Sequence, residues 1–203
     1  TVLPRMLNVI MVPLYTHVLP KEEYGEVSII FAYFVFFNVI LAYGMETAFF
    51  RFYNKMKNSK EVLSTSGWSI VATSILFFTA AFLAQDFIAE MANIPVKYIQ
   101  LVIWILLLDA LVIIPFTWLR AAEKPMRFAI IKIINVCINL GLNIFFLLFL
   151  KDLAVENSVF QSIYIPDFEI SYIFISNLVA SGATLLMMLP LPCLHKNQLL
   201  QLS

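Results

Sequence analysis

Long apolar runs alternate with short polar segments along this chain. A helix that crosses a bilayer needs roughly 20 mostly apolar residues, each rising about 1.5 Å. Six runs are long enough, and they cover residues 1–19, 26–45, 67–88, 98–119, 128–150 and 170–191. The pattern therefore predicts an all-α fold, a polytopic membrane helix bundle of about six transmembrane helices with no soluble domain between them.

The overall composition supports a membrane protein. Hydrophobic residues make up 62% of the 203 residues and charged residues 13%, and the mean hydropathy is +0.90. Soluble domains contain about half apolar and about a quarter charged residues. We therefore expect hydrocarbon, and not water, to surround most of the side chains.

The first apolar run differs from the others because it carries Pro4, Arg5 and Asn8. The sequence starts without methionine, so we expect the natural chain to begin earlier and these residues to be a fragment of it. A cleaved signal peptide is the competing interpretation. Against it, Pro13 interrupts the apolar run, and residues 20–23 do not resemble a small-residue cleavage site.

Lysine and arginine are concentrated in every second connection. The connections 45–66 and 120–127 and the C-terminal tail hold Arg51, Lys55, Lys57, Lys60, Arg120, Lys124, Arg127 and Lys196. The opposite connections hold only Lys21, Lys97 and Lys151. Because Lys and Arg are retained on the cytoplasmic side, we expect the first set, and both ends of this chain, to be cytoplasmic.

The residue types that soluble enzymes and metal sites use are sparse. Cys137 and Cys193 are not placed to form an exported disulfide, and His17 and His195 fall near opposite membrane faces. The sequence contains no Gly-rich phosphate loop, no H-E-x-x-H and no C-x-x-C. We therefore expect no enzyme activity, no cofactor, no metal site and no nucleic-acid partner.

Polar residues inside the apolar runs are the candidates for function, because they are costly in hydrocarbon. The fifth run carries Lys132, Asn135, Asn139 and Asn143, whose spacings of 3, 4 and 4 place them on one helix face. A polar stripe of this kind favours the wall of a water-filled cavity. In the alternative interpretation, the asparagines bond neighbouring helices and Lys132 extends to the interface.

Arg5 adds a second cation to the predicted cavity. If the first run leaves the membrane near Leu19, Arg5 lies about 21 Å below the outer edge of a core about 30 Å thick. Lys132 lies about 7 Å above the inner edge by the same rise, so the two cations would share a level. Alternatively, Arg5 is a juxtamembrane charge.

Three further features stand out in or beside the apolar runs. Asp109 lies near the middle of the fourth run, where a carboxylate pairs with a cation, binds a coupling proton or ion, or serves as a structural partner. Glu46 and Arg51 close the second run, where we expect an interfacial ion pair. Pro13 and Pro115 predict helix kinks.

Five segments of the chain form a recognisable set: Leu3–Asn8 (LPRMLN), Val12–Leu19 (VPLYTHVL), Glu23–Gly25 (EYG), Tyr43–Phe52 (YGMETAFFRF) and Leu119–Pro125 (LRAAEKP). Together they resemble bacterial polysaccharide biosynthesis flippases of the multidrug/oligosaccharidyl-lipid/polysaccharide exporter superfamily. The resemblance implies about twelve to fourteen spans in two pseudo-symmetric lobes, of which residues 1–203 would form the N-terminal lobe, in a bacterial inner membrane. It also implies that Arg5 binds a pyrophosphate.

The resemblance implies a transporter that flips a polyprenyl-pyrophosphate-linked oligosaccharide to the outer leaflet, with membrane lipid and polysaccharide assembly proteins as partners. Arg5 is the position that matches the pyrophosphate-binding cations of the family. From depth and helix face alone, we expect Lys132 to bind the pyrophosphate with it. The amides of Asn135, Asn139 and Asn143 would bind the sugar, and Asp109 would couple or pair. A drug or cation exporter of the same superfamily is one alternative. A membrane-embedded polymerase or glycosyltransferase, using acidic residues of 151–169, is another, and a purely structural membrane subunit is a third.

Overall fold

The computed structural model describes residues 11–55, 59–150, 153, 165 and 168–189 of the chain. Residues 11–18 are helical, and the rest of this part folds into seven α-helices and one π-helical segment, with no strand. The elements are α2 (Lys21–Ala42), α3 (Met45–Lys55), α4 (Ser59–Leu83), α5 (Gln85–Ala92), α6 (Val96–Ala121), α7 (Pro125–Ile144), η1 (Phe145–Phe149) and α10 (Glu169–Met188). The predicted all-α bundle is confirmed.

Five helical segments of the described part are long and apolar enough to cross a membrane. They are Lys21–Lys55, Glu61–Leu83, Val96–Ala121, Pro125–Phe149 and Glu169–Met188. Each corresponds to one of the predicted spans from the second to the sixth. Of the first predicted span, only residues 11–19 lie inside the described part, and most of the predicted loop 151–169 lies outside it.

Helix ends differ most from the prediction at the two ends of α4. The third span was expected at 67–88, but α4 begins at Ser59 and ends at Leu83, and the separate helix α5 follows. The expected connection 45–66 is largely helical, because α3 occupies Met45–Lys55. Hydropathy predicts only the part of a helix that lies in hydrocarbon. Helical turns that continue into a polar segment are therefore not predicted by it.

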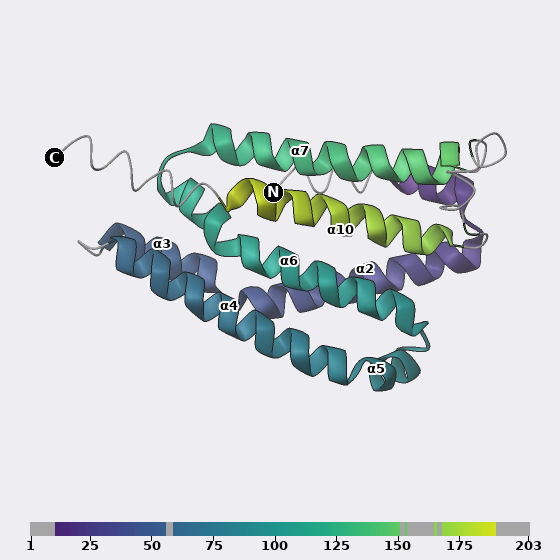
Figure 1. Ribbon diagram of the computed structural model, residues 1–203, viewed down its shortest axis with the longest axis horizontal. Helices are drawn as coiled ribbons and strands as arrows, with labels where there is room; N and C mark the ends of the chain where they lie inside the picture. Colours follow the sequence, from purple (N-terminus) through teal and green to yellow (C-terminus); the bar gives the residue numbers. More distant parts are fainter. Residues whose placement is uncertain (1–10, 56–58, 151–152, 154–164, 166–167, 190–203) are drawn as a thin grey trace.

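The long helices run roughly along the long axis of the molecule, in alternating directions, and α6 lies among them (Figure 1). It packs against α2, α3, α4, α5, α7 and α10. In the apolar windows of α6 and α10, half of the residues are buried, against at most 17% in the other three spans. We conclude that α6 and α10 form the inner layer of this bundle.

Small residues on α10 allow neighbouring helices to approach it closely. Ser176, Ala180 and Thr184 recur every four residues and are all buried, and Thr184 bonds Asn135 of α7. A Cβ on Gly182 would lie 3.9 Å from Leu108 Cδ1 of α6. Small residues at this spacing bring transmembrane helices together, where van der Waals packing replaces the hydrophobic effect as the main attraction.

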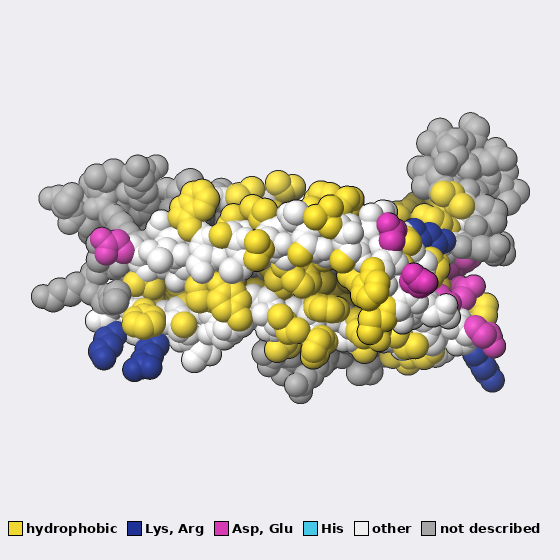
Figure 2. Space-filling model, turned by 90° about the horizontal axis from the view of Figure 1, so that it is seen from below, with side chains coloured by type: hydrophobic (Ala, Val, Ile, Leu, Met, Phe, Trp, Pro, Cys, Tyr) yellow, Lys and Arg dark blue, Asp and Glu magenta, His cyan; other side chains and the backbone are white. Residues whose placement is uncertain are grey.

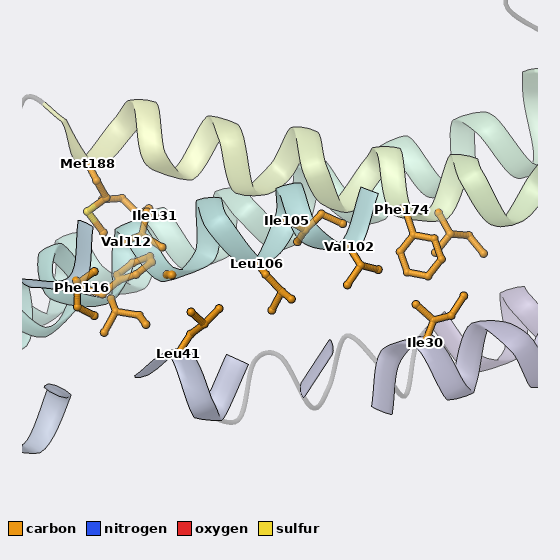
Figure 3. Close-up of a cluster of buried hydrophobic side chains, with 14 of the residues drawn as sticks. Ile30, Leu41, Val102, Ile105, Leu106, Val112, Phe116, Ile131, Phe174 and Met188 are labelled. Carbon is orange, nitrogen blue, oxygen red and sulfur yellow. The ribbon is translucent and has the colours of Figure 1, made fainter. Parts of the chain in front are cut away.

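The remaining core consists of large aliphatic and aromatic side chains between α6 and its neighbours. Figure 3 shows part of this cluster, to which α2, α6, α7 and α10 all contribute. The labelled members are Ile30, Leu41, Val102, Ile105, Leu106, Val112, Phe116, Ile131, Phe174 and Met188. The core therefore runs along α6 and fixes the depth of the polar residues that this helix carries.

Charge separates the two ends of the bundle from its sides. Figure 2 shows the charged side chains gathered at both ends, with hydrophobic and uncharged surface between them. The end where α3 and α6 finish and α7 begins, here the basic end, carries Arg51, Lys55, Arg120, Lys124 and Arg127. The opposite end, where α2, α6 and α10 begin, is here the acidic end and carries Glu22, Glu23, Asp86, Glu90 and Glu169 beside Lys21 and Lys97. The sides expose large apolar residues such as Leu76 and Leu186, as expected for a multi-pass membrane protein.

Two backbone features affect the helices that line the site. Tyr43 and Gly44 have φ values of 29° and 73° and end α2 before α3 begins. Such φ values are unfavourable for most residues but easily adopted by glycine. Pro115 lies inside α6, which continues as a helix across it, and Pro13 lies inside the helical residues 11–18.

Candidate functional site

A cavity of about 710 Å³ lies between residues 11–15, α2, α3, α6, α7 and α10. Its polar lining is Tyr15, Ser28, Asn38, Glu46, Asp109, Arg120, Lys132, Asn135, Asn139, Asn177, Ser181 and Thr184. Aromatic rings of Tyr24, Phe31, Phe34, Phe116 and Phe128 also line it. A cavity of this size with convergent polar groups is the usual form of a ligand site.

Three members of the predicted stripe on α7 line this cavity: Lys132, Asn135 and Asn139. The Asn135 amide nitrogen donates to Thr184 Oγ1 on α10 at 2.9 Å, and the Asn139 amide nitrogen donates to Asn177 Oδ1 at 3.4 Å. Each asparagine therefore both faces the cavity and bonds a neighbouring helix. The helical spacing of the sequence predicted that they share a face, but not which helix lies opposite.

Asn143, the fourth member of the stripe, is fully buried and does not line the cavity. The Tyr15 hydroxyl donates to its Oδ1 at 3.2 Å, and its amide nitrogen donates to Asn139 Oδ1 at 2.7 Å. These bonds tie residues 11–18 to α7, which is the interhelical role left open by the sequence. The π-helical turn Phe145–Phe149 follows directly, and such turns occur frequently at functional sites.

Asp109 joins three helices at the cavity wall. Ser181 Oγ of α10 donates to its Oδ1 at 2.7 Å, and the Asn38 amide nitrogen of α2 donates to its Oδ2 at 3.4 Å. Lys132 of α7 is close enough to interact with this carboxylate electrostatically. Asp109 therefore bonds two neighbouring helices and also lines the cavity.

Glu46 forms an ion pair with Arg120, at 2.6 Å between Oε2 and Nη2. The sequence favoured a pair of Glu46 with Arg51, but Arg51 is exposed on α3 and Arg120 is the partner. Both members of the pair line the cavity. The sequence analysis did not identify Glu46 or Arg120 as cavity residues, because both lie at the edge of an apolar run.

Aromatic rings hold both cavity cations of the described part. The Arg120 guanidinium lies 5.4 Å from the ring centre of Phe50 and 5.7 Å from that of Phe128, and Lys132 Nζ lies 4.4 Å from that of Phe116. The rings of Phe116 and Phe128 meet edge to face at 5.4 Å. Such cation–π contacts strengthen when water is excluded.

The charged groups in the described lining balance each other. Glu46 and Asp109 oppose Arg120 and Lys132, so the described lining contains two anions beside two cations. Arg5, the other predicted cation, lies outside the described residues, as do Cys193 and His195. Within the described residues, no group of His, Cys, Asp and Glu is arranged to hold a metal ion.

Comparison with known proteins identifies a family. The sequence matches the family model described as "Polysaccharide biosynthesis protein" over residues 1–189, which is most of the chain. No curated protein and no solved structure matches it significantly.

Proposed function

Because the chain belongs to the polysaccharide biosynthesis protein family, we propose that it flips a polyprenyl-pyrophosphate-linked oligosaccharide across a bacterial inner membrane. The described bundle would be one lobe of a two-lobed exporter, with its basic end facing the cytoplasm. The cavity would receive the cargo from the cytoplasmic leaflet and release it to the outer leaflet by alternating access. Polysaccharide assembly proteins would use the product.

The observation that carries this proposal is the combination of a cation and several amides in one cavity. Lys132 makes no ion pair with a described carboxylate, so its ammonium group is available to a phosphate. Asn135, Asn139 and Asn177 present amide groups beside it, and amides both donate to and accept from sugar hydroxyls. Charge-assisted bonds to phosphate are the stronger ones, so Lys132 would contribute most of the affinity.

Asp109 offers a way to release the cargo. Its carboxylate is a neighbour of Lys132, and a change of its charge on binding a proton or ion would alter the attraction of the cavity for an anion. Arg5 would add a cation from the first span. No covalent bond changes in this cycle, so the protein would act as a transporter.

One observation favours a second function, the export of organic cations. Glu46 and Asp109 place two carboxylates in the lining, which also contains six aromatic rings. Aromatic faces and carboxylates together attract organic cations. Efflux of a cationic dye that is lost in Asp109→Asn, without movement of a lipid-linked sugar, would support this alternative.

The proposal is tested in cells depleted of their own flippase, by scoring which leaflet holds the lipid-linked oligosaccharide. We expect the wild type to restore outward movement and Lys132→Met to reduce it about tenfold or more, because the phosphate loses a charged partner. Lys132→Arg should retain most of the movement. Arg5→Ala, in the predicted first span, should also lose it.

The matched control is Lys55→Met, which removes an exposed lysine of α3 that does not line the cavity. It should move cargo like the wild type. Equal movement by Lys132→Met and the wild type, at equal expression, would contradict the role of Lys132. No movement by the wild type with any lipid-linked sugar would contradict the proposed function itself.

A further inference from the structure

Arg120 is positioned by more than its ion pair with Glu46. Its guanidinium lies near the ring faces of Phe50 and Phe128, and Nη2 also approaches Thr117 Oγ1 at 3.5 Å. Its Nε is buried and has no hydrogen-bond partner. Phe128 belongs to α7 and not to α3, so its ring would still hold the guanidinium if Glu46 left together with α3. One donor of the guanidinium is unused even while Glu46 is bound.

Lys132 and Arg120 both line the cavity, over neighbouring aromatic rings. Lys132 Nζ lies over Phe116 and the Arg120 guanidinium over Phe128, and these two rings meet edge to face. Only Arg120 makes an ion pair with Glu46, whereas Lys132 interacts electrostatically with both Asp109 and Glu46. Two neighbouring cations, of which one is not in an ion pair, form a site that suits a group with more than one negative charge.

Glu46 is the more exposed member of the ion pair. Its side chain is 46% exposed, whereas that of Arg120 is 35% exposed. It lies in the first turn of α3, directly after the joint at Tyr43 and Gly44, where the backbone leaves the helical conformation. A partly exposed ion pair contributes little net stability, so a competing anion can displace the carboxylate at small cost.

We infer that Glu46 is a resident counter-anion, which a diphosphate-bearing cargo replaces on Arg120, so that Arg120 and Lys132 together bind the diphosphate and α3 separates from α6. The inference rests on the proposed function for the identity of the cargo. A diphosphate offers several oxygens to the guanidinium fork and can reach the unused Nε. Binding of the cargo would thereby break the Glu46–Arg120 contact between α3 and α6.

Displacement is measured as the affinity of the protein, purified in detergent, for inorganic pyrophosphate in magnesium-free buffer, by calorimetric titration. We expect Glu46→Gln to bind about three- to tenfold more tightly than the wild type, because the internal competitor is neutralised. Arg120→Gln should bind about tenfold more weakly. The double variant with Glu46→Gln and Arg120→Gln should bind pyrophosphate no better than Arg120→Gln alone, because the gain in affinity from Glu46→Gln requires the freed Arg120 guanidinium.

The matched control is Glu61→Gln, which neutralises an exposed glutamate in the first turn of α4 and should leave the affinity unchanged. A polyprenyl diphosphate serves as a second probe and should respond to Glu46→Gln by the same factor as pyrophosphate. An effect confined to the lipid probe, or an unchanged or weaker pyrophosphate affinity in folded Glu46→Gln, would overturn the inference. Flipping by the wild type is scored separately, so the proposed function can stand when the inference fails.

Movement of α3 gives an independent readout. Spin labels are attached at Arg51→Cys on α3 and at Met126→Cys at the start of α7, and the distance between the two labels is measured. The native cysteines are removed by Cys137→Ser and Cys193→Ser. Both labelled positions are exposed. Pyrophosphate should lengthen this distance in the wild-type background, and Glu46→Gln should show the longer population without pyrophosphate. A distance that neither change affects would overturn the release of α3.

Discussion

The two sides of the cavity are built differently. On one side, α6 and α10 pack through small residues, half of their apolar windows are buried, and they share the bond between Asp109 and Ser181. On the other, only 17% of the apolar window of the span Lys21–Lys55 is buried, and the joint at Tyr43 and Gly44 separates α2 from α3. The difference indicates a fixed wall of α6 and α10 facing a wall of α2 and α3 that can change position.

Overpacking the fixed wall should give the largest effect. Ala180 is fully buried on α10. Ala180→Leu therefore forces extra methylene groups into the seam, that is, the packing between α10 and its neighbouring helices, and should destabilise the protein by about 1–3 kcal/mol or more. Thermal unfolding in detergent, followed by loss of monodisperse protein, measures the change. Val179→Leu, at an exposed neighbouring position, is the control and should unfold like the wild type. Similar unfolding of the two variants would contradict a tightly packed seam.

Asp109 tests whether the fixed wall also carries function. Asp109→Leu leaves Ser181 and Asn38 without their shared acceptor, so we expect a loss of about 1–3 kcal/mol in unfolding free energy. Asp109→Asn retains an oxygen for Ser181 and should be less destabilised, while transport falls because the charge is lost. Transport assayed per folded molecule separates the two effects. Normal transport by Asp109→Asn would limit Asp109 to a structural role.

The asparagines of α7 can likewise be separated into one with a structural role and others on the cavity surface. Asn143 is buried between Tyr15 and Asn139, so Asn143→Ala should reduce stability by about 1 kcal/mol and leave the transport of folded molecules nearly intact. Asn135→Ala, on the cavity surface, should reduce transport several-fold with a smaller change in stability. Unfolding and transport measured on the same preparations test this division. A larger loss of transport in Asn143→Ala than in Asn135→Ala would contradict this division and would place the binding surface deeper than the cavity.

Glycine substitutions compare the joint with a regular helix and should give the smallest effects. Gly44 has a φ of 73°, so Gly44→Ala strains the joint by about 1 kcal/mol. Gly25 lies inside α2, and a Cβ there meets no atom within 4 Å. Gly25→Ala should therefore stabilise the helix by about 0.5–1 kcal/mol. Unfolding midpoints that shift in the same direction would show that the joint carries no special constraint.

Continuous apolar runs made the long helices predictable from the sequence. The fourth run, expected at 98–119, became α6 at Val96–Ala121, because its apolar residues continue on both sides of Asp109 and Pro115. The short helices α3 and α5 were not predicted, since their polar residues hide them from a hydropathy count. Sequence periodicity also placed Lys132 and two asparagines on one face.

Partners across helices could not be predicted in the same way. Tyr15 and Asn143 are 128 residues apart, and Glu46 and Arg120 are 74 apart. Nothing in the spacing of one helix shows which helix it faces, so the ion pair with Arg120 and the burial of Asn143 required the fold. The neutral charge balance of the described lining depends on the same long-range contacts.

The most direct test of the central claim uses purified protein in proteoliposomes with a fluorescent polyprenyl-pyrophosphate-linked oligosaccharide. The fraction of the lipid that an impermeant quencher reaches reports its leaflet over time. We expect the wild type to equilibrate the lipid across the bilayer, Lys132→Met to slow this about tenfold or more, and Lys55→Met to match the wild type. Rates equal to those of protein-free vesicles for the wild type, or equal rates for Lys132→Met and the wild type, would contradict a flippase whose cavity cation binds the diphosphate.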